Sequence, residues 1–156
     1  MIKLRLPPRV KVLEALSAIS DGRINKVNDK KYIVSSSDSS RKYDVFVDIE
    51  KRHVSSTDNG TFYRNYVGYP IIAILMLKGV IPYNEKIANA LKGINWRKLN
   101  EFYKSYALVE QHIKNMLKKK GIESKEVDDY IGLVMKILRE LNLIKVSKWW
   151  NGCELS

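Results

Sequence analysis

The residues best suited to binding chemistry lie between positions 62 and 69 and at position 78. Arg64 and Lys78 can neutralise phosphates, and the neighbouring tyrosines can stack on bases. An apolar helix is expected to begin directly afterwards, and the amides of a helix N-terminus attract anions. The segment therefore predicts a surface that binds a nucleotide or a template strand, although the tyrosines could instead pack in the core or in a hairpin. The predicted binding residues are Arg64, Asn65, Tyr66, Tyr69 and Lys78.

A second candidate is the row of carboxylates Asp44, Asp48 and Glu50, which Arg52 follows. Carboxylates followed by a basic residue on a strand hold divalent metal in restriction-like nucleases. That motif requires a lysine where this chain has Arg52, and it belongs to a larger sheet than a hairpin provides. The same spacing is also typical of the polar face of a half-solvated strand. We therefore expect no catalytic residue in this chain.

Metal binding is not favoured either. Two strands followed by an apolar helix are similar to the SWIM zinc module, but Ser55-Ser56 and Gly68-Tyr69-Pro70 stand where its ligands would be. The single cysteine, Cys153, cannot complete a four-ligand zinc site with the chain's two histidines. We expect no metal and no cofactor.

Charge indicates the class of partner. The 156-residue chain has a formal net charge of +11 and a pI of about 9.7. Such an excess attracts polyanions, although charged surfaces also serve ion-pair networks in proteins of heat-loving organisms. The length fits one domain over residues 1–156, and neither a membrane span nor a secretory leader is recognisable, so a soluble, cytoplasmic protein is expected.

Turn signals and period-two alternation predict a β region in the first half. Pro7 and Pro8 open an expected helix that ends at Asp21-Gly22. Alternating apolar residues at 32–34 and 43–49 predict an antiparallel hairpin. Asn59-Gly60 predicts a type I′ turn between two further short strands, so that hairpins occupy about residues 31–64.

The second half has helical spacing. The apolar run 70–79 predicts a buried central helix, and a short helix is expected between Pro82 and Gly93. One long helix is predicted from about Asn95 to Gly121, and a last one from Ser124. The expected fold is therefore mainly α: a compact helical domain with an inserted antiparallel β-hairpin region.

Several separated segments occur in an order that is known from one family. Leu6-Pro7-Pro8-Arg9-Val10 followed by Leu13-Glu14-Ala15-Leu16 is similar to its Phe-Pro-Pro-Cys-Ile opening and first helix. The remaining matches are Tyr66 to Gly79, Asn84 to Leu91, Leu99-Asn100-Glu101 and Tyr106-Ala107-Leu108-Val109-Glu110. Together they resemble the C-terminal domain of the large subunit of DNA primase, over roughly residues 6–20 and 64–113.

The departures from that family specify the resemblance further. Arg9 occupies the first iron–sulfur cysteine position, the other three cysteines are absent, and residues 31–63 look inserted. A small, basic, cluster-free relative of this domain is what the PriX family of non-catalytic third subunits of archaeal primase is understood to be. The chain resembles that family, which implies partners: the primase catalytic and large subunits, a nucleoside triphosphate, and a single-stranded DNA template or RNA/DNA primer.

The resemblance also implies a role for particular residues. Such a subunit holds the initiating nucleotide and the template, while the catalytic subunit joins nucleotides. Lys78 matches a family phosphate contact, and Arg64 and Tyr66 fall near the family's His/Arg contacts, whereas Pro70 replaces an arginine. The alternative from another class is a free-standing module that binds single-stranded nucleic acid.

Overall fold

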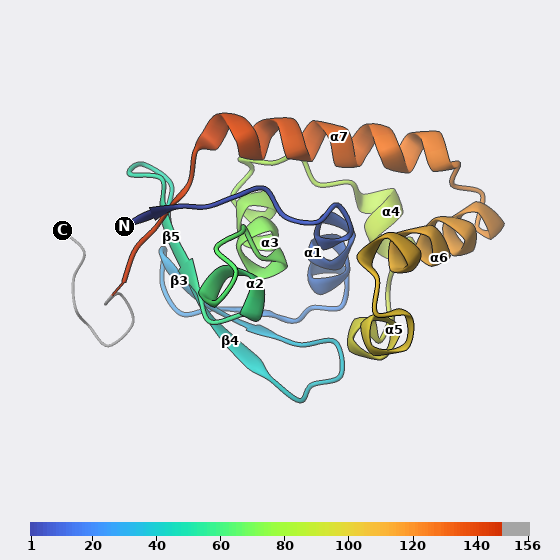
Figure 1. Cartoon of the computed structure of the whole chain (residues 1–156), viewed down its shortest axis with the longest axis horizontal. Coiled ribbons are helices and arrows are strands. Elements are labelled where there is room, and N and C mark those ends of the chain that lie inside the picture. The colour runs from blue at the N-terminus through green and yellow to red at the C-terminus, as the bar shows by residue number, and fades with distance from the viewer. Residues whose placement is uncertain (148–156) are drawn as a thin grey trace.

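The computed structural model describes residues 1–147, so Trp149, Trp150 and Cys153 lie outside the described residues. It is a mixed α/β fold, with 48% helix, 17% strand and a six-stranded sheet (Figure 1). The expectation of a mainly α domain with an inserted hairpin region is therefore wrong. The strands extend beyond the predicted hairpins at both ends of the chain.

The sheet has the strand order β1-β6-β5-β4-β3-β2. Neighbouring strands are antiparallel except β5 and β6, which are parallel. β1 lies near the first described residue and β6 near the last, so both ends of the described chain belong to the sheet. The strands are β1 (Ile2–Lys3), β2 (Ile24–Lys26), β3 (Lys31–Ser35), β4 (Lys42–Asp48), β5 (His53–Ser56) and β6 (Ile144–Lys145).

The predicted hairpin of β3 and β4 is confirmed. Tyr32 pairs with Val45, and both side chains are buried on the core face, as the alternation indicated. The predicted ribbon around Asn59-Gly60 is wrong, because helix α2 (Asn59–Phe62) begins there instead. Its N-cap is Asp58, whose carboxylate accepts a hydrogen bond of 3.1 Å from the Thr61 amide.

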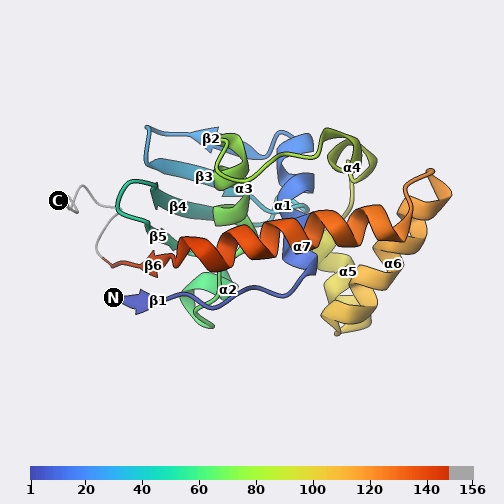
Figure 2. The same cartoon turned by 90° about the horizontal axis from the view of Figure 1, so that it is seen from above.

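The helices surround one buried helix, α1. Figure 2 shows the sheet at one end of the molecule and α7 running along its length, and α1 packs against α3, α4, α6 and α7. The buried central helix predicted at 70–79 is confirmed as α3. The longer helices are α1 (Val10–Ser20), α3 (Tyr69–Leu77), α4 (Glu85–Ala90), α5 (Trp96–Tyr103), α6 (Tyr106–Lys119) and α7 (Ser124–Leu141).

The single long helix predicted from about Asn95 is two helices. Lys104 takes a left-handed conformation with φ 53°, which ends α5, and the Ser105 hydroxyl caps α6 by accepting from the Leu108 amide at 3.3 Å. The apolar spacing of three and four residues continues across this break, so periodicity alone does not reveal it. The break turns α5 away from the axis of α6 (Figure 1).

Arg9, the residue at the cysteine position of the resembling family, has a structural role. Its guanidinium contacts Glu110 at 3.3 Å and Asp128 at 2.7 Å, and Lys114 also reaches Asp128 at 2.6 Å. This network ties the start of α1 to α6 and α7. Among the described residues, no helix combines the length and the apolar character that crossing a membrane requires.

The close approach of α2 to the start of α3 generates a stability prediction. A Cβ added at Gly68 would lie 2.1 Å from the Asp58 carboxylate, whereas one at Gly132 in α7 meets nothing within 4 Å. Gly68→Ala is expected to lower the free energy of unfolding by about 2 kcal/mol or more, since the buried cap must shift. Gly132→Ala is expected to raise it by about 0.5–1 kcal/mol, because alanine favours a helix interior. Urea unfolding of both variants measures this, and equal effects would contradict it.

Candidate functional site

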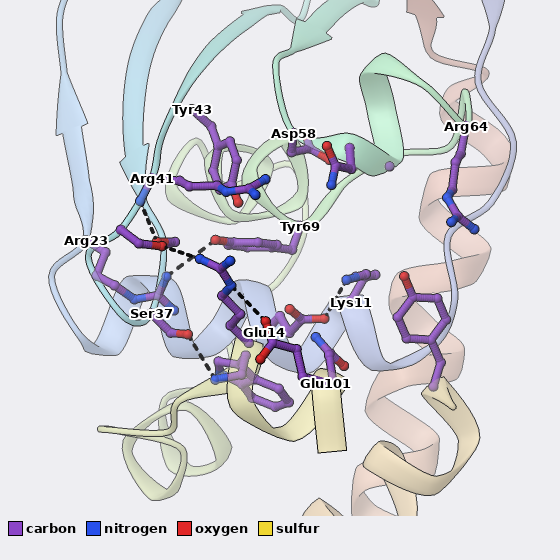
Figure 3. Close-up of a pocket in the computed structure, with 18 of the residues that line it drawn as sticks. Lys11, Glu14, Arg23, Ser37, Arg41, Tyr43, Asp58, Arg64, Tyr69 and Glu101 are labelled. Carbon is purple, nitrogen blue, oxygen red and sulfur yellow. Dashed lines mark hydrogen bonds and ion pairs between the residues drawn. The ribbon is translucent and has the colours of Figure 1, made fainter. Parts of the chain in front are cut away.

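A cavity of about 400 Å³ lies where the tip of the β3–β4 hairpin faces α1, α2 and α5 (Figure 3). Side chains from α1, the hairpin, α2, α3, α5 and α6 line it, so segments far apart in the sequence meet there. The lining combines basic, aromatic and acidic residues. Clefts that combine aromatic walls with converging polar groups are the usual form of small-molecule sites.

The basic residues of the cavity are Lys11, Arg23, Arg41, Arg64 and Arg97. Figure 3 shows Arg23 and Arg41 on one side of Glu14, and Arg64 on the other. Arg97 is held by the Ser40 hydroxyl at 2.7 Å and by Glu101 at 3.1 Å. Arg41 and Arg64 form no ion pair with any residue that the structure describes. Two guanidinium groups are therefore available to an anionic ligand.

Aromatic side chains form much of the wall. Tyr43 and Tyr69 meet edge to face with ring centroids 6.3 Å apart, and Arg23 lies over the Tyr69 ring at 5.9 Å. Burial raises the pKa of Tyr69 and of Tyr66 above the usual tyrosine value, so both hydroxyls stay protonated near neutral pH. They can therefore donate hydrogen bonds. The remaining aromatic lining residues are Trp96 and Tyr106.

A buried ion pair lies at the back of the cavity. Lys11 Nζ lies 2.9 Å from Glu14 Oε2 on α1, and both side chains are largely shielded from solvent. Burial lowers the pKa of the Lys11 ammonium, but the nearby Glu14 carboxylate and the hydroxyls of Tyr66 and Tyr106 outweigh it, so the net pKa is above the usual lysine value. Lys11 is therefore positively charged at neutral pH.

Several polar atoms of the cavity residues are buried without a protein partner. Within the described part of the chain, no hydrogen bond reaches Arg23 Nη2, Asp58 Oδ1, Trp96 Nε1 or Asn100 Oδ1. Buried polar atoms in native proteins are nearly always satisfied. Two of these atoms are donors and two are acceptors, so the wall of the cavity holds unsatisfied hydrogen-bonding groups of both kinds.

The predicted binding residues separate into two groups. Arg64, Tyr66 and Tyr69 all line the cavity. Asn65 instead accepts a hydrogen bond of 2.5 Å from Lys145 Nζ and so holds β6. Lys78 lies at the opposite end of α3 from Tyr69, where its ammonium donates to the Asp29 carbonyl at 2.6 Å.

Other lining residues were not found from the sequence. Lys11 lies in the first turn of α1 and Arg23 follows that helix. Arg41 follows a serine-rich turn, and Trp96 and Arg97 open α5. Nothing local distinguishes these residues from other basic or aromatic positions in a chain of net charge +11. A weak signal was available only for Lys11, which stands three residues before Glu14 on the first helix.

Of the carboxylates in the predicted row, Asp48 is held by protein contacts at the end of β4. Asp48 is only 4% exposed, so it does not lie on a solvated strand face. Its oxygens accept from the Lys51 amide at 3.2 Å and lie 3.4 Å from Lys30 Nζ. Burial raises the pKa of Asp48, but these contacts outweigh it and keep the net pKa below the usual value. In the region that the structure covers, no cluster of three His, Cys, Asp or Glu could hold a metal.

Comparison with known families places the chain. The family model described as uncharacterised conserved protein UCP014422 matches residues 4–144. The chain belongs to this family. The match spans every residue that lines the cavity, from Lys11 to Tyr106. No curated protein and no solved structure matches the chain.

The buried ion pair of this UCP014422 member generates a second stability prediction. Lys11→Met leaves the Glu14 charge buried and unpaired, so the free energy of unfolding is expected to fall by about 3 kcal/mol. The double variant Lys11→Met, Glu14→Leu is expected to recover to within about 1 kcal/mol of the wild type, because neither charge is then buried.

Urea unfolding at neutral pH measures both effects. The matched control is Lys125→Met, which removes the lysine of an exposed pair with Asp129 at 2.8 Å and should cause no measurable loss. A double variant that is as unstable as Lys11→Met would contradict the account of the pair.

Proposed function

We propose that this chain is a non-catalytic accessory subunit of a DNA primase, which holds the initiating nucleoside triphosphate and the template during de novo primer synthesis. The observation that carries the proposal is the cavity, where unpaired arginines, aromatic rings and unsatisfied polar atoms converge. Its partners are the primase catalytic and large subunits. It acts in the cytoplasm, in DNA replication.

The charges in the cavity favour a phosphate-bearing ligand. Glu14 is paired with Lys11, and Glu101 with Arg97, so their negative charges are largely offset. Arg41 and Arg64 remain for phosphate oxygens, with which guanidinium groups form strong charge-assisted hydrogen bonds. A triphosphate thereby gains affinity without any base being read.

The rest of the cavity suits a nucleoside. The tyrosine rings offer faces or edges to a base, and stacking on aromatic side chains tolerates any base. Asp58 Oδ1 is an acceptor and Trp96 Nε1 a donor without partners, which suits ribose hydroxyls and base edges. A nucleoside triphosphate matches both features of the cavity. Its phosphates suit the arginines, and its base and ribose suit the tyrosines and the unsatisfied polar atoms.

The family resemblance supports the same role. The resembling segments 6–20 and 64–113 contain α1, α3, α4, α5 and most of α6, and α1 packs against α3, α4 and α6. A primase must join two nucleotides with no primer to anchor either. Holding one of them by its triphosphate makes the encounter effectively intramolecular, while the metals that promote transfer stay in the partner chain.

A free-standing single-strand-binding module is the second candidate. Phe62 and Tyr63 are 54% and 73% exposed beside Arg64, and their rings meet edge to face with centroids 4.8 Å apart. Exposed aromatic rings beside a basic residue can stack successive bases of a strand. This module would need no partner subunit.

Nucleotide binding by the isolated protein tests where the site lies. Arg41→Ala is expected to weaken binding of a nucleoside triphosphate by roughly tenfold or more, since one charge-assisted contact contributes about 1.5–3 kcal/mol. Lys78→Ala and the exposed α7 control Arg139→Ala are expected to leave affinity unchanged. Isothermal titration measures this, and a loss in Lys78→Ala that equals the loss in Arg41→Ala would move the site to the far end of α3.

Primer synthesis tests the role. In primase assembled with its catalytic and large subunits, Arg41→Ala combined with Arg64→Ala should reduce de novo initiation roughly ten- to a hundredfold at subsaturating nucleotide. Extension of a supplied primer should change little, because its 3′ end is already held by the duplex and the catalytic subunit. Raising the nucleotide concentration should partly restore initiation. Equal losses of initiation and extension in an assembled complex would favour the single-strand-binding module.

A further inference from the structure

A second cavity lies between α6 and the side of α5 opposite the first cavity, and we name it the α5–α6 groove. It encloses about 350 Å³, and its apolar lining residues are Ile94, Leu99, Phe102, Ile113 and Met116. Five of its eight described lining residues are apolar, whereas basic and acidic side chains line much of the first cavity. Phe102 is 77% exposed, and exposing a large aromatic side chain to water is unfavourable in free energy.

The groove is fixed in shape by contacts at one side. The Tyr103 hydroxyl and His112 Nδ1 lie 2.8 Å apart, which ties the end of α5 to the middle of α6. Phe102 meets the Tyr103 ring edge to face with centroids 4.9 Å apart, which keeps it at the groove. An apolar surface that is already formed loses little conformational entropy when a partner binds.

The groove is positively charged at its rim. Lys98 supplies this charge within the described lining, which contains no Asp or Glu. The acidic residues of the two helices are engaged elsewhere, Glu101 with Arg97 and Glu110 with Arg9. Lys98 forms no ion pair with any residue described in the structure, and Lys118 and Lys119 occupy the last turn of α6, the latter three residues after Met116.

We propose that the α5–α6 groove docks an acidic, amphipathic segment of a partner protein. Apolar side chains of that segment would fill the groove around Phe102, and its carboxylates would face Lys98 and the lysines of α6. Exposed aromatic residues in apolar pockets are the usual anchors of protein interfaces, and complementary charge sets their specificity. Lys98 is the one lysine or arginine in the described lining, which favours such a segment over a polynucleotide, whose binding depends on several phosphate contacts.

The probe is a fluorescein-labelled helical peptide of about 16 residues, long enough for stable helical turns, with Leu and Phe on one face and Glu on the other. Its counterpart carries Lys in place of every Glu. The full chain is expected to bind the acidic peptide saturably and the basic one much more weakly. Phe102→Ala is expected to weaken binding by at least about tenfold, as an interface anchor does, and Lys98→Glu should weaken it too.

Matched controls separate the groove from general stickiness. Phe62→Ala removes another exposed phenylalanine, and Lys136→Glu reverses another exposed lysine on α7, so neither should change peptide binding. Thermal unfolding checks that all the variants remain folded. The proposal is overturned if both peptides bind alike or neither binds, or if the control variants lose as much affinity as Phe102→Ala.

Other occupants of the groove give their own results, each of which overturns the proposal. A single-stranded oligonucleotide that competes with the peptide, with competition lost in Phe102→Ala, would assign the groove to nucleic acid. Self-association that Phe102→Ala abolishes in sedimentation would assign it to a second copy. Peptide binding that appears only in a variant ending at Ser147 would assign it to residues 148–156 of this chain.

Discussion

The position of α1 constrains the rest of the molecule. Eight of its 11 residues are buried, because α3, α4, α6 and α7 pack around it. A helix buried on so many sides can carry polar residues only where each finds a partner. Glu14 is therefore held by Lys11, and the Ser17 hydroxyl donates to the Leu91 carbonyl at 3.0 Å. The polar side of α1 that remains forms the back of the cavity proposed to bind a nucleotide.

Helix α5 divides the two surfaces on which function is proposed. Arg97, Asn100 and Glu101 line the cavity proposed to bind a nucleotide, while Leu99 and Phe102 line the α5–α6 groove. Only Trp96 is buried in this helix, and its amide donates to the Ser37 hydroxyl at 2.9 Å on the hairpin tip. Leu99 and Tyr103 are partly buried against the core, so α5 is held there while its two sides face different surfaces.

The charge excess has different consequences in different places. Where lysine and arginine meet carboxylates, as in the network of Arg9, Glu110, Lys114 and Asp128, they connect helices that are distant in sequence. Glu110 and Lys114 are only 13% exposed, so this network is partly shielded from solvent. In the cavity, Arg41 and Arg64 form no ion pair with a described residue, and there the excess is available to a ligand.

The elements that the sequence predicted correctly rest on local information. The β3–β4 hairpin follows from alternation around a serine-rich turn, and α3 follows from an apolar run that begins at Tyr69-Pro70. The helix expected from Ser124 is confirmed as α7, with Val127 and Leu138 buried as the spacing predicted. Of the candidate site, the sequence indicated Arg64, Tyr66 and Tyr69, because aromatic and basic side chains gather there directly before a helix N-terminus.

Only the tertiary structure decided the fold class and the cavity. β5 and β6 pair in parallel although almost ninety residues separate them, and strands of two to four residues have no period to detect. The left-handed turn at Lys104, which divides the predicted long helix, depends on packing and not on a glycine or proline signal. Six elements contribute side chains to the cavity. Lys11, Arg41 and Trp96 are far apart in the sequence and are brought together by tertiary contacts, which the pattern of a single sequence does not reveal.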